Sequence, residues 1–268
     1  MTIHPTAIVH PTAEIASGVT IGAYSVIGEK VKIGPHTIIH PHVVLENNTV
    51  LGKENQIFSG AVLGGVPQDL RWKGEFSQLI IGDRNIIREY VTLHRGSEGG
   101  TTVVGNDNYL MAYMHAGHNV KIGNGCVVTN CVQLAGYVEL EDKVVIGGLA
   151  GIHQFVRIGT MAMIGGFSKS PKDVPPYVKV SGMPSRVYGL NVVGLKRNGI
   201  PPDRRERLKQ AYNLVYRSSL NLSQALAEIE KTLEPSPEIT HFINFMRNAS
   251  RQGVLSREDS KVAVGSFE

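Results

Sequence analysis

Residues 21–34 read IGAYSVIGEKVKIG and carry an isoleucine at every sixth position. The same spacing of aliphatic residues runs from Ile3 to Leu63, returns from Ile81 to Leu93, and continues from Val104 to Ile164. An α-helix needs apolar residues every three to four positions and a half-buried strand every two, so a period of six fits neither. A fixed short period of this kind is typical of a parallel β-helix.

The six-residue unit predicts one face of a triangular prism: a short strand, then a turn, with one aliphatic side chain pointing inward. Three units would make one coil, and successive coils would stack at the inter-strand spacing of about 4.8 Å. Each coil buries its aliphatic residues only against its neighbours, so stability accumulates coil by coil. Small residues two positions before the aliphatic one, such as Ser25 and Cys126, predict crowded inward corners. The frequent Gly and Asn residues predict turns with positive φ.

Two segments interrupt the repeat, and we expect loops at residues 64–80 and 95–103. The first loop replaces two six-residue units and carries Trp72, the only tryptophan of the chain. The second adds residues around a Gly-rich stretch. Loops that interrupt a rigid repeat are natural places for a binding function.

The composition fits one long solenoid plus a smaller unit, with 268 residues of which 42% are hydrophobic. Two cysteines without close spacing argue against a disulfide framework or a zinc ribbon, and Cys126 is expected to be a buried structural thiol. No apolar run reaches the length of a membrane span and the repeat starts without a leader, so we expect a cytoplasmic protein. Residues 196–268 carry 12 Lys and Arg against 9 Asp and Glu, which suits an acidic partner but lacks the dense basic clusters expected for nucleic acid.

After Ile164 the repeat stops, prolines follow, and helical spacing of apolar residues appears. This spacing predicts about three helices, around residues 208–215, 222–233 and 239–246. We divide the chain into a β-helix domain at 1–190, an α-helical domain at 191–255 and a loose tail at 256–268.

The histidines fall into two groups. Most lie at repeat turns, often before proline, where a turn role is expected. His115 and His118 bracket Ala116, and we expect their imidazoles side by side on the outer surface, with His153 about two coils later. An imidazole can take a proton from an alcohol near neutral pH, and backbone N–H groups beside glycines can hold an oxyanion. The sequence has no nucleophile elbow, P-loop or dinucleotide motif, which leaves direct transfer assisted by a general base.

Several motifs together resemble the UDP-N-acetylglucosamine O-acyltransferases that open lipid A biosynthesis. They are VPQDL at 66–70, HRG at 94–96, HAGH at 115–118, IHQF at 152–155, DVPPY at 173–177 and GLNVVGLKR at 189–197. The resemblance runs from the N-terminus to about Leu255. It implies a left-handed parallel β-helix with a small α-helical C-terminal domain, and a homotrimer with its active sites between the prisms. It also implies transfer of a 3-hydroxyacyl chain from acyl carrier protein to the glucosamine 3-hydroxyl, with no cofactor and no metal.

The resemblance also implies roles for individual residues. His118 would be the general base, and the N–H of Gly136 the oxyanion donor. Asp69 and Arg71 would hold the sugar, and the mildly basic C-terminal part would face the acidic carrier protein.

Further roles follow in the same way. His115 and His153 would contact substrate or acyl chain. Gln154, Asn191 and Arg197 would meet the nucleotide. Gly166 stands at the position whose size sets acyl-chain length, and its lack of a side chain implies room for a longer chain.

Some residues depart from the family pattern. Tyr137 stands in place of a histidine, and Met114, Val193 and Asn198 also differ. Asn119 replaces the aspartate that commonly follows the catalytic histidine, so no carboxylate support for His118 is expected from that position. These departures leave open the same transfer to a 3-amino UDP-sugar.

Three other functions fit the sequence less well. A γ-type carbonic anhydrase would use His115, His118 and His153 as zinc ligands, but gives no purpose to the helical domain or the first loop. A structural solenoid would show a repetitive outer face, whereas the outward residues vary. The N-acyltransferase of the same pathway carries an additional N-terminal uridine-binding domain, which does not precede the repeat here.

Overall fold

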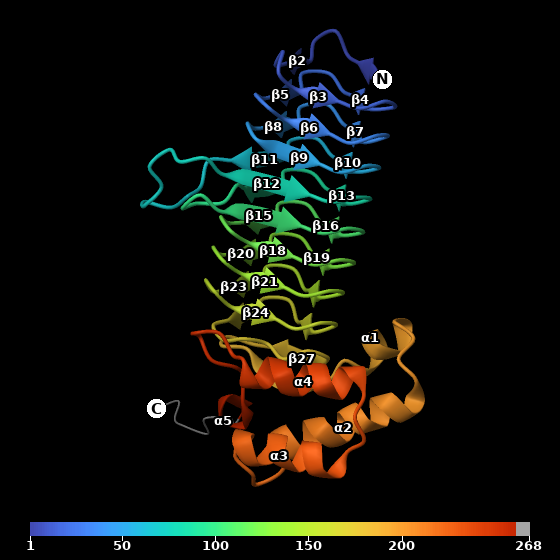
Figure 1. The fold of residues 1–268 in the computed structure, drawn as a ribbon, viewed down its shortest axis with the longest axis vertical. Coiled ribbons are helices and arrows are strands. Elements are labelled where there is room, and N and C mark those ends of the chain that lie inside the picture. The colour runs from blue at the N-terminus through green and yellow to red at the C-terminus, as the bar shows by residue number, and fades with distance from the viewer. Residues whose placement is uncertain (261–268) are drawn as a thin grey trace.

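The computed structural model describes residues 1–260 and shows a three-sided prism standing on a group of helices (Figure 1). Three sheets, A, B and C, form the sides of the prism. Sheet A contains β1 (Thr2–Ile3), β4 (Thr20–Ile21), β7 (Ile38–Ile39), β10 (Gln56–Ile57), β13 (Ile86–Ile87), β16 (Tyr109–Leu110), β19 (Val127–Val128), β22 (Val145–Ile146), β25 (Met163–Ile164), β27 (Val178–Ser181) and β28 (Arg186–Leu190). Sheet B contains β2 (Ile8–Val9), β5 (Val26–Ile27), β8 (Val44–Leu45), β11 (Val62–Gly65), β14 (Thr92–His94), β17 (His115–Ala116), β20 (Gln133–Leu134), β23 (Gly151–Ile152) and β26 (Lys169–Ser170). Sheet C contains β3 (Glu14–Ile15), β6 (Lys32–Ile33), β9 (Thr49–Leu51), β12 (Gln78–Ile81), β15 (Thr101–Val104), β18 (Lys121–Ile122), β21 (Glu139–Leu140) and β24 (Arg157–Ile158).

The strand register confirms the predicted coil of three six-residue units. Thr2 pairs with Thr20 and Thr20 pairs with Ile38, in parallel. Gln56 pairs with Ile86, so the coil with the first insertion is longer by two units. Ile86 pairs with Tyr109 across the second insertion, so both insertions leave the stacking of the coils intact.

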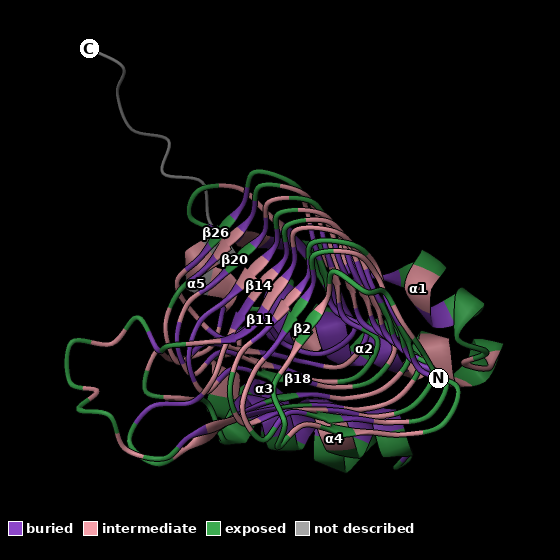
Figure 2. Cartoon of the chain, turned by 90° about the horizontal axis from the view of Figure 1, so that it is seen from above, coloured by how far each residue is buried: buried purple, intermediate pink, exposed green. Residues whose placement is uncertain are grey.

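The aliphatic residues of the repeat form one continuous core, seen from above as buried segments (Figure 2). Those from Ile21 to Ile164 are buried, whereas Ile3, Val9 and Ile15 are partly exposed at the open N-terminal end. Burial of one such side chain contributes about 2 kcal/mol, so each coil with three of them stabilises its neighbours.

The corners of the prism differ from the prediction that Gly and Asn supply the positive φ. Most residues with positive φ are neither, for example Tyr24 with φ 59° and Tyr90 with φ 56°. Their cost is offset by hydrogen bonds between coils, such as Tyr24 N–H to Thr6 Oγ1 at 3.1 Å. The glycines that follow the aliphatic residues serve close approach instead. A Cβ on Gly22 would lie 2.5 Å from the backbone nitrogen of Pro41.

A column of buried polar side chains runs along one inward corner. Each side chain accepts the backbone N–H of the residue one coil further on: Asn55 N–H donates to Thr37 Oγ1, Asn85 N–H to Asn55 Oδ1, Asn108 N–H to Asn85 Oδ1 and Cys126 N–H to Asn108 Oδ1. Cys126 is buried as predicted, and burial raises the pKa of its thiol to about 12. The asparagines span the coils that carry the insertions, where they satisfy backbone groups inside the prism.

The hairpin of β27 and β28 closes the prism, and the helices follow below it (Figure 1). The three predicted helices are confirmed as α2 (Pro202–Tyr216), α3 (Leu222–Thr232) and α4 (Pro237–Arg247). Two short helices, α1 (Val192–Arg197) and α5 (Arg257–Ser260), were not predicted.

The start of the predicted loose tail is structured, because it contains α5 and Asp259 pairs with Lys172 at 2.6 Å. The rest of that predicted tail, residues 261–268, lies outside the described residues. Within residues 1–260, none of the helices combines the length and the apolar character needed to cross a bilayer.

Candidate active site

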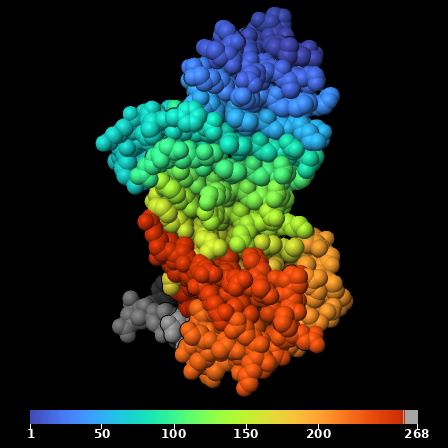
Figure 3. Space-filling model, in the orientation of Figure 1, coloured from blue at the N-terminus to red at the C-terminus, as the bar shows by residue number. Residues whose placement is uncertain are grey.

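The two insertions meet at the corner between sheets B and C and protrude from the side of the prism (Figure 3). They hold one another through side chains. Arg71 Nη1 pairs with Glu98 Oε1 at 3.1 Å, and Ser97 Oγ donates to Asp69 Oδ2 at 3.0 Å. Glu98 N–H also donates to Glu75 Oε1 at 2.7 Å. The first loop is thereby fixed against the second, directly beside the next coil, which carries His118.

The imidazole of His118 is buried and held at Nδ1. That atom lies 2.9 Å from Asn119 Oδ1 and 3.1 Å from Ser97 Oγ. The amide oxygen of Asn119 is identified by the backbone of Ser97, because Oδ1 accepts Ser97 N–H at 2.9 Å while Nδ2 donates to Ser97 C=O at 3.3 Å. An amide oxygen can only accept, so Nδ1 of His118 carries a proton, and in the neutral imidazole Nε2 then has the free lone pair.

Three residues, Asp69, Tyr137 and Gly136, surround the Nε2 side of His118. Asp69 Oδ2 lies 3.8 Å away, and Tyr137 packs edge-on with the ring centroids 5.2 Å apart. Gly136 packs against the ring so closely that a Cβ there would lie 2.5 Å from Nε2. Only glycine therefore fits at position 136 without displacing the imidazole.

The backbone N–H of Gly136 is left free by the fold. It makes no hydrogen bond within residues 1–260. Prolines, which have no N–H, occupy the equivalent place two residues after the aliphatic one in other units, as at Pro5 and Pro41. Gly136 lies beside the His118 imidazole, and its N–H is available to donate to a ligand.

The charges at the site are paired across the two loops. Arg71 donates from Nε and Nη2 to the carboxylate of Asp69, and these hydrogen bonds hold the pKa of Asp69 well below its usual range. Burial raises the pKa of Tyr137, and its hydroxyl donates to Glu98 at 2.7 Å, which raises the pKa further. The site thus contains an ionised carboxylate and a neutral phenol at neutral pH.

The prediction that His115 and His118 lie side by side on the surface is wrong. His118 is only 7% exposed, and His115 packs edge-on against His94 with the ring centroids 5.1 Å apart. Burial, and secondarily the positive charge of a protonated His94, lower the pKa of His115 to about 4. His115 is therefore neutral at pH 7, and its Nδ1 lies 2.8 Å from Thr92 Oγ1.

A shallow apolar cleft of about 500 Å³ runs along sheet B beside the site. His115 and His153 line it together with Leu134, Gly151 and Lys169. The cleft joins two of the residues predicted to contact substrate, and its apolar lining suits an acyl chain.

The other predicted residues lie apart from His118. Gln154 occupies the place equivalent to His118 two coils further on, and its backbone oxygen accepts from Gln252. Gly166 lies at the turn between β25 and β26 and packs against Gly148. Asn191 caps α1, because its Oδ1 accepts Gly194 N–H at 3.0 Å. Arg197 is exposed at the end of α1, on the side of the prism opposite the two loops (Figures 1 and 2).

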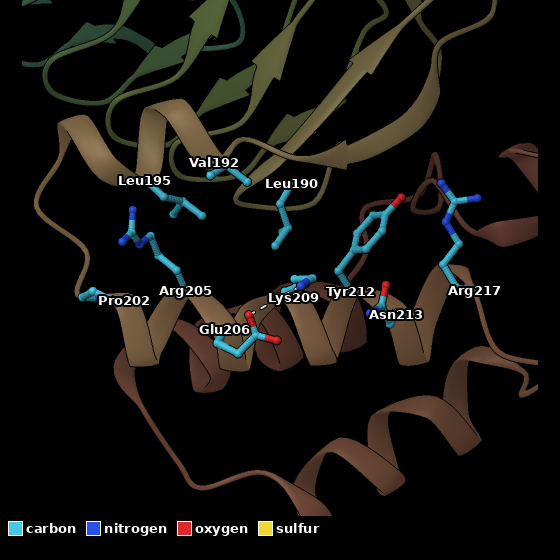
Figure 4. A pocket seen from close by; sticks show the side chains of 10 residues that line it. All are labelled: Leu190, Val192, Leu195, Pro202, Arg205, Glu206, Lys209, Tyr212, Asn213 and Arg217. Atoms are coloured by element: carbon cyan, nitrogen blue, oxygen red, sulfur yellow. Dashed lines mark ion pairs between the residues drawn. The ribbon is translucent and has the colours of Figure 1, made fainter.

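A hollow of about 600 Å³ lies between α1 and α2 (Figure 4). It contains none of the predicted catalytic residues; Arg205, Lys209 and Arg217 line it with Glu206, which pairs with Lys209 at 3.6 Å. Its chemistry is that of a basic surface rather than a proton-transfer site. Within residues 1–260 of one chain, no three His, Cys, Asp or Glu side chains gather so that they could hold a metal ion.

Sequence reasoning missed two residues that hold His118. Ser97 lies in the second insertion, whose position was predicted but whose residues were not assigned. Asn119 was treated only as the loss of a carboxylate, although its amide fixes the tautomer of His118. The signal for both was the Gly-rich second insertion, since Gly96 and Gly100 permit a tight loop: a Cβ on Gly100 would lie 2.2 Å from Asn119 Nδ2.

Comparison with known proteins gives a consistent result. Residues 173–255 match the family model described as Udp N-acetylglucosamine O-acyltransferase, domain 2. The acyl-[acyl-carrier-protein]–UDP-N-acetylglucosamine O-acyltransferase of an Anaeromyxobacter species is 49% identical over 253 residues, which cover 94% of this chain and 98% of the relative. The enzyme of that name from Gloeothece citriformis is 48% identical over 203 residues, covering 75% of this chain and 73% of the relative.

Solved structures agree. The UDP-N-acetylglucosamine acyltransferase of Francisella novicida superposes with a TM-score of 0.92 at 38% identity, covering 100% of this chain and 99% of that one. The predicted left-handed parallel β-helix with C-terminal helices is thereby confirmed. By fold, length and sequence, this chain belongs to the family of the UDP-N-acetylglucosamine O-acyltransferases.

Proposed function

We propose that this protein is an acyltransferase that moves a 3-hydroxyacyl chain from acyl carrier protein to the glucosamine 3-hydroxyl of UDP-N-acetylglucosamine, in the cytoplasm and as the first step of lipid A biosynthesis. The observation that carries the proposal is the arrangement around His118. Its Nδ1 is a donor to Asn119, its Nε2 is a free acceptor, and the unused N–H of Gly136 lies beside it. The Anaeromyxobacter relative, which matches 94% of this chain, is named as an O-acyltransferase that uses acyl-[acyl-carrier-protein] and UDP-N-acetylglucosamine.

The reaction follows from this geometry in two steps. Nε2 of His118 takes the proton of the sugar hydroxyl while its oxygen attacks the thioester carbonyl carbon, and the N–H of Gly136 stabilises the oxyanion. As the tetrahedral intermediate collapses, the C–S bond breaks and the thiolate of the carrier leaves. The proton on His118 passes to that sulfur, so the products are the O-acyl sugar and the free thiol. No cofactor is needed, because the thioester supplies the activated acyl group.

The remaining groups bind the two substrates. Asp69 and Arg71, which pair with each other beside His118, hold the sugar, and the apolar cleft beside His115 and His153 takes the acyl chain. The basic lining of the hollow between α1 and α2 suits the acidic carrier protein. Gly166 sets the length of the chain and admits a longer one.

A homotrimer completes the site. Arg197 and Asn191 are proposed to meet the nucleotide, yet in one chain α1 lies across the prism from the two protruding loops (Figure 2). A second copy can supply α1 to the cleft beside the first. Mixing two inactive variants, His118→Ala and Arg197→Ala, tests this assembly, because mixed trimers would contain some sites with both native residues. No recovery of activity on mixing and reassembly would contradict a shared site.

The test of the reaction is acyl transfer by the purified protein from a panel of 3-hydroxyacyl carrier proteins to UDP-N-acetylglucosamine. His118→Ala should abolish transfer, whereas His10→Ala, on an exposed turn near the N-terminal end, should not. The panel also measures chain length. Because Tyr137 and Asn119 differ from the family pattern, the 3-amino analogue of the sugar is the second acceptor to be tested; transfer to neither acceptor would refute the proposal.

A further inference from the structure

Ser97 is fully buried, and its hydroxyl lies within hydrogen-bonding distance of three side chains at the candidate site. The distances from Oγ are 3.0 Å to Asp69 Oδ2, 3.1 Å to His118 Nδ1 and 3.1 Å to Asn119 Oδ1. The proposed reaction assigns no role to this hydroxyl. A hydroxyl has one proton to donate, so with three polar neighbours it can donate to one of them and must act as an acceptor or a weak contact toward the others.

The surroundings determine which way the hydroxyl proton points. Asn119 Oδ1 already accepts the backbone N–H of Ser97 at 2.9 Å and the Nδ1 proton of His118 at 2.9 Å. Asp69 is ionised and offers a charged acceptor, and hydrogen bonds to a charged partner are about twice as strong as neutral ones. The hydroxyl therefore donates to Asp69, and its oxygen lone pair faces the N–H of His118.

We infer that Ser97 is a positioning residue that couples the carboxylate of Asp69 to the Nδ1 side of His118. The inference rests on the proposed function, because it concerns the histidine proposed as the base. When Nε2 takes the proton of the sugar hydroxyl, the imidazole becomes positively charged, and a carboxylate one hydroxyl away stabilises that charge. Position 119 supplies no carboxylate to His118, as expected, and the support comes instead from the first insertion through the second.

The second insertion is built to place this serine. A Cβ on Gly96 would lie 2.3 Å from the carbonyl carbon of Gly100, so the two glycines let the loop close tightly. Gly100 N–H donates to Ser97 C=O at 2.9 Å, which closes the turn around the serine. The carboxylate is held from the other side by Arg71. Both ends of the coupling are therefore fixed by contacts that do not involve His118.

The test compares Ser97→Ala with Ser97→Thr, which keeps a hydroxyl, and with Ser77→Ala as the matched control. Ser77 is also buried and begins the return to β12, but its hydroxyl has no hydrogen-bond partner within residues 1–260. Ser97→Ala should lower kcat roughly 10- to 100-fold and leave KM for the UDP-sugar within about threefold, because Asp69 keeps its bonds to Arg71. Ser97→Thr should recover most of the loss, and Ser77→Ala should match wild type.

The pH profile separates positioning from packing. The titratable groups facing His118 are Asp69, Tyr137 and His94, and all remain in these variants. Loss of the hydroxyl that links Asp69 to Nδ1 should move the acid limb of the kcat/KM profile to lower pH in Ser97→Ala, whereas a purely structural defect would lower the rate without moving the limb. An unmoved limb, or equal losses in Ser97→Ala and Ser97→Thr with both variants folded by circular dichroism, would overturn the inference.

Coupling through Asp69 has its own test. In an Asp69→Asn background, Ser97→Ala should cost less than about threefold further; fully multiplicative losses would show that Ser97 acts independently of the carboxylate and overturn the inference. A readout without activity is the nitrogen-15 spectrum of the His118 ring. Wild type should show a protonated Nδ1 and an unprotonated Nε2, and the reverse tautomer would overturn the inference. An inactive wild-type protein with the expected tautomer would instead refute only the proposed function.

Discussion

Gly136→Ala should strongly lower the activity while leaving the protein folded, because the new methyl group would occupy the space of the His118 imidazole, the proposed general base. The Cβ would lie 2.5 Å from Nε2 of His118 and 2.6 Å from Cε1, where ordinary contacts begin at 3.4 Å. The ring must therefore move by about 1 Å, a displacement that can cost about 10²-fold in rate. The His118 ring cannot move away from the new methyl group, because Nδ1 on its far side already lies 2.9 Å from Asn119 Oδ1 and 3.1 Å from Ser97 Oγ. A loss of about 10²-fold corresponds to about 2.7 kcal/mol of transition-state stabilisation.

The assay is the steady-state rate of acyl transfer at saturating concentrations of both substrates, with thermal unfolding followed in parallel. Gly189→Ala is the matched control, because a Cβ there would meet nothing within 4 Å. Gly136→Ala should lose about 10²-fold in kcat with a melting temperature near that of Gly189→Ala. A folded Gly136→Ala protein with wild-type kcat would refute the position assigned to His118 and its role as the base.

Other predictions concern stability. The pKa of His115 is about 4 in the folded protein against an ordinary value of 6.5, so between these values the unfolded chain binds more protons and the free energy of unfolding falls as the pH is lowered. Denaturant titrations of wild type and His115→Gln at pH 7 and pH 5 should show this decrease smaller by about 2 kcal/mol in the variant. Asn85→Ala leaves Asn108 N–H and Gly105 C=O without their partner and should destabilise the fold by about 2–5 kcal/mol, whereas Asn85→Thr should cost less. An unchanged denaturation midpoint in Asn85→Ala would contradict this prediction. Leu110→Ala, in the middle of the core, should cost about 2–5 kcal/mol in the same measurement.

The repeat was predictable because its signal is local. Each aliphatic residue meets its equivalents one coil away, so the period in the sequence is also the period of the core. The corner residues were less predictable. Tyr24 and Tyr90 adopt positive φ because hydrogen bonds between coils impose that conformation, which a preference for Gly and Asn does not reveal. The asparagine column was also missed, since each Asn is satisfied only by a residue on another coil.

Individual residues of the candidate site could be predicted from the sequence, but their connections could not. His118 and Asp69 could be selected by residue type and motif. Their connection through Ser97 could not, because it depends on how two separate insertions fold against each other. Short helix α1 was missed for a related reason: its start is fixed by the cap of Asn191, whose Nδ2 is held by Met161 C=O from the prism.

The stacking of coils also sets the distance between the His118 site and the C-terminal helical domain. Asn119, Tyr137 and Phe155 follow one another down a single corner, and Arg251 from the helical base packs on Phe155. These four residues line one hollow of about 530 Å³ that leads from beside His118 towards the helical domain. Each coil advances about 4.8 Å, so this separation changes only in whole steps. A duplicated or deleted coil between these levels would therefore move the proposed site at His118 by one inter-strand spacing relative to the helical domain, without remodelling either part.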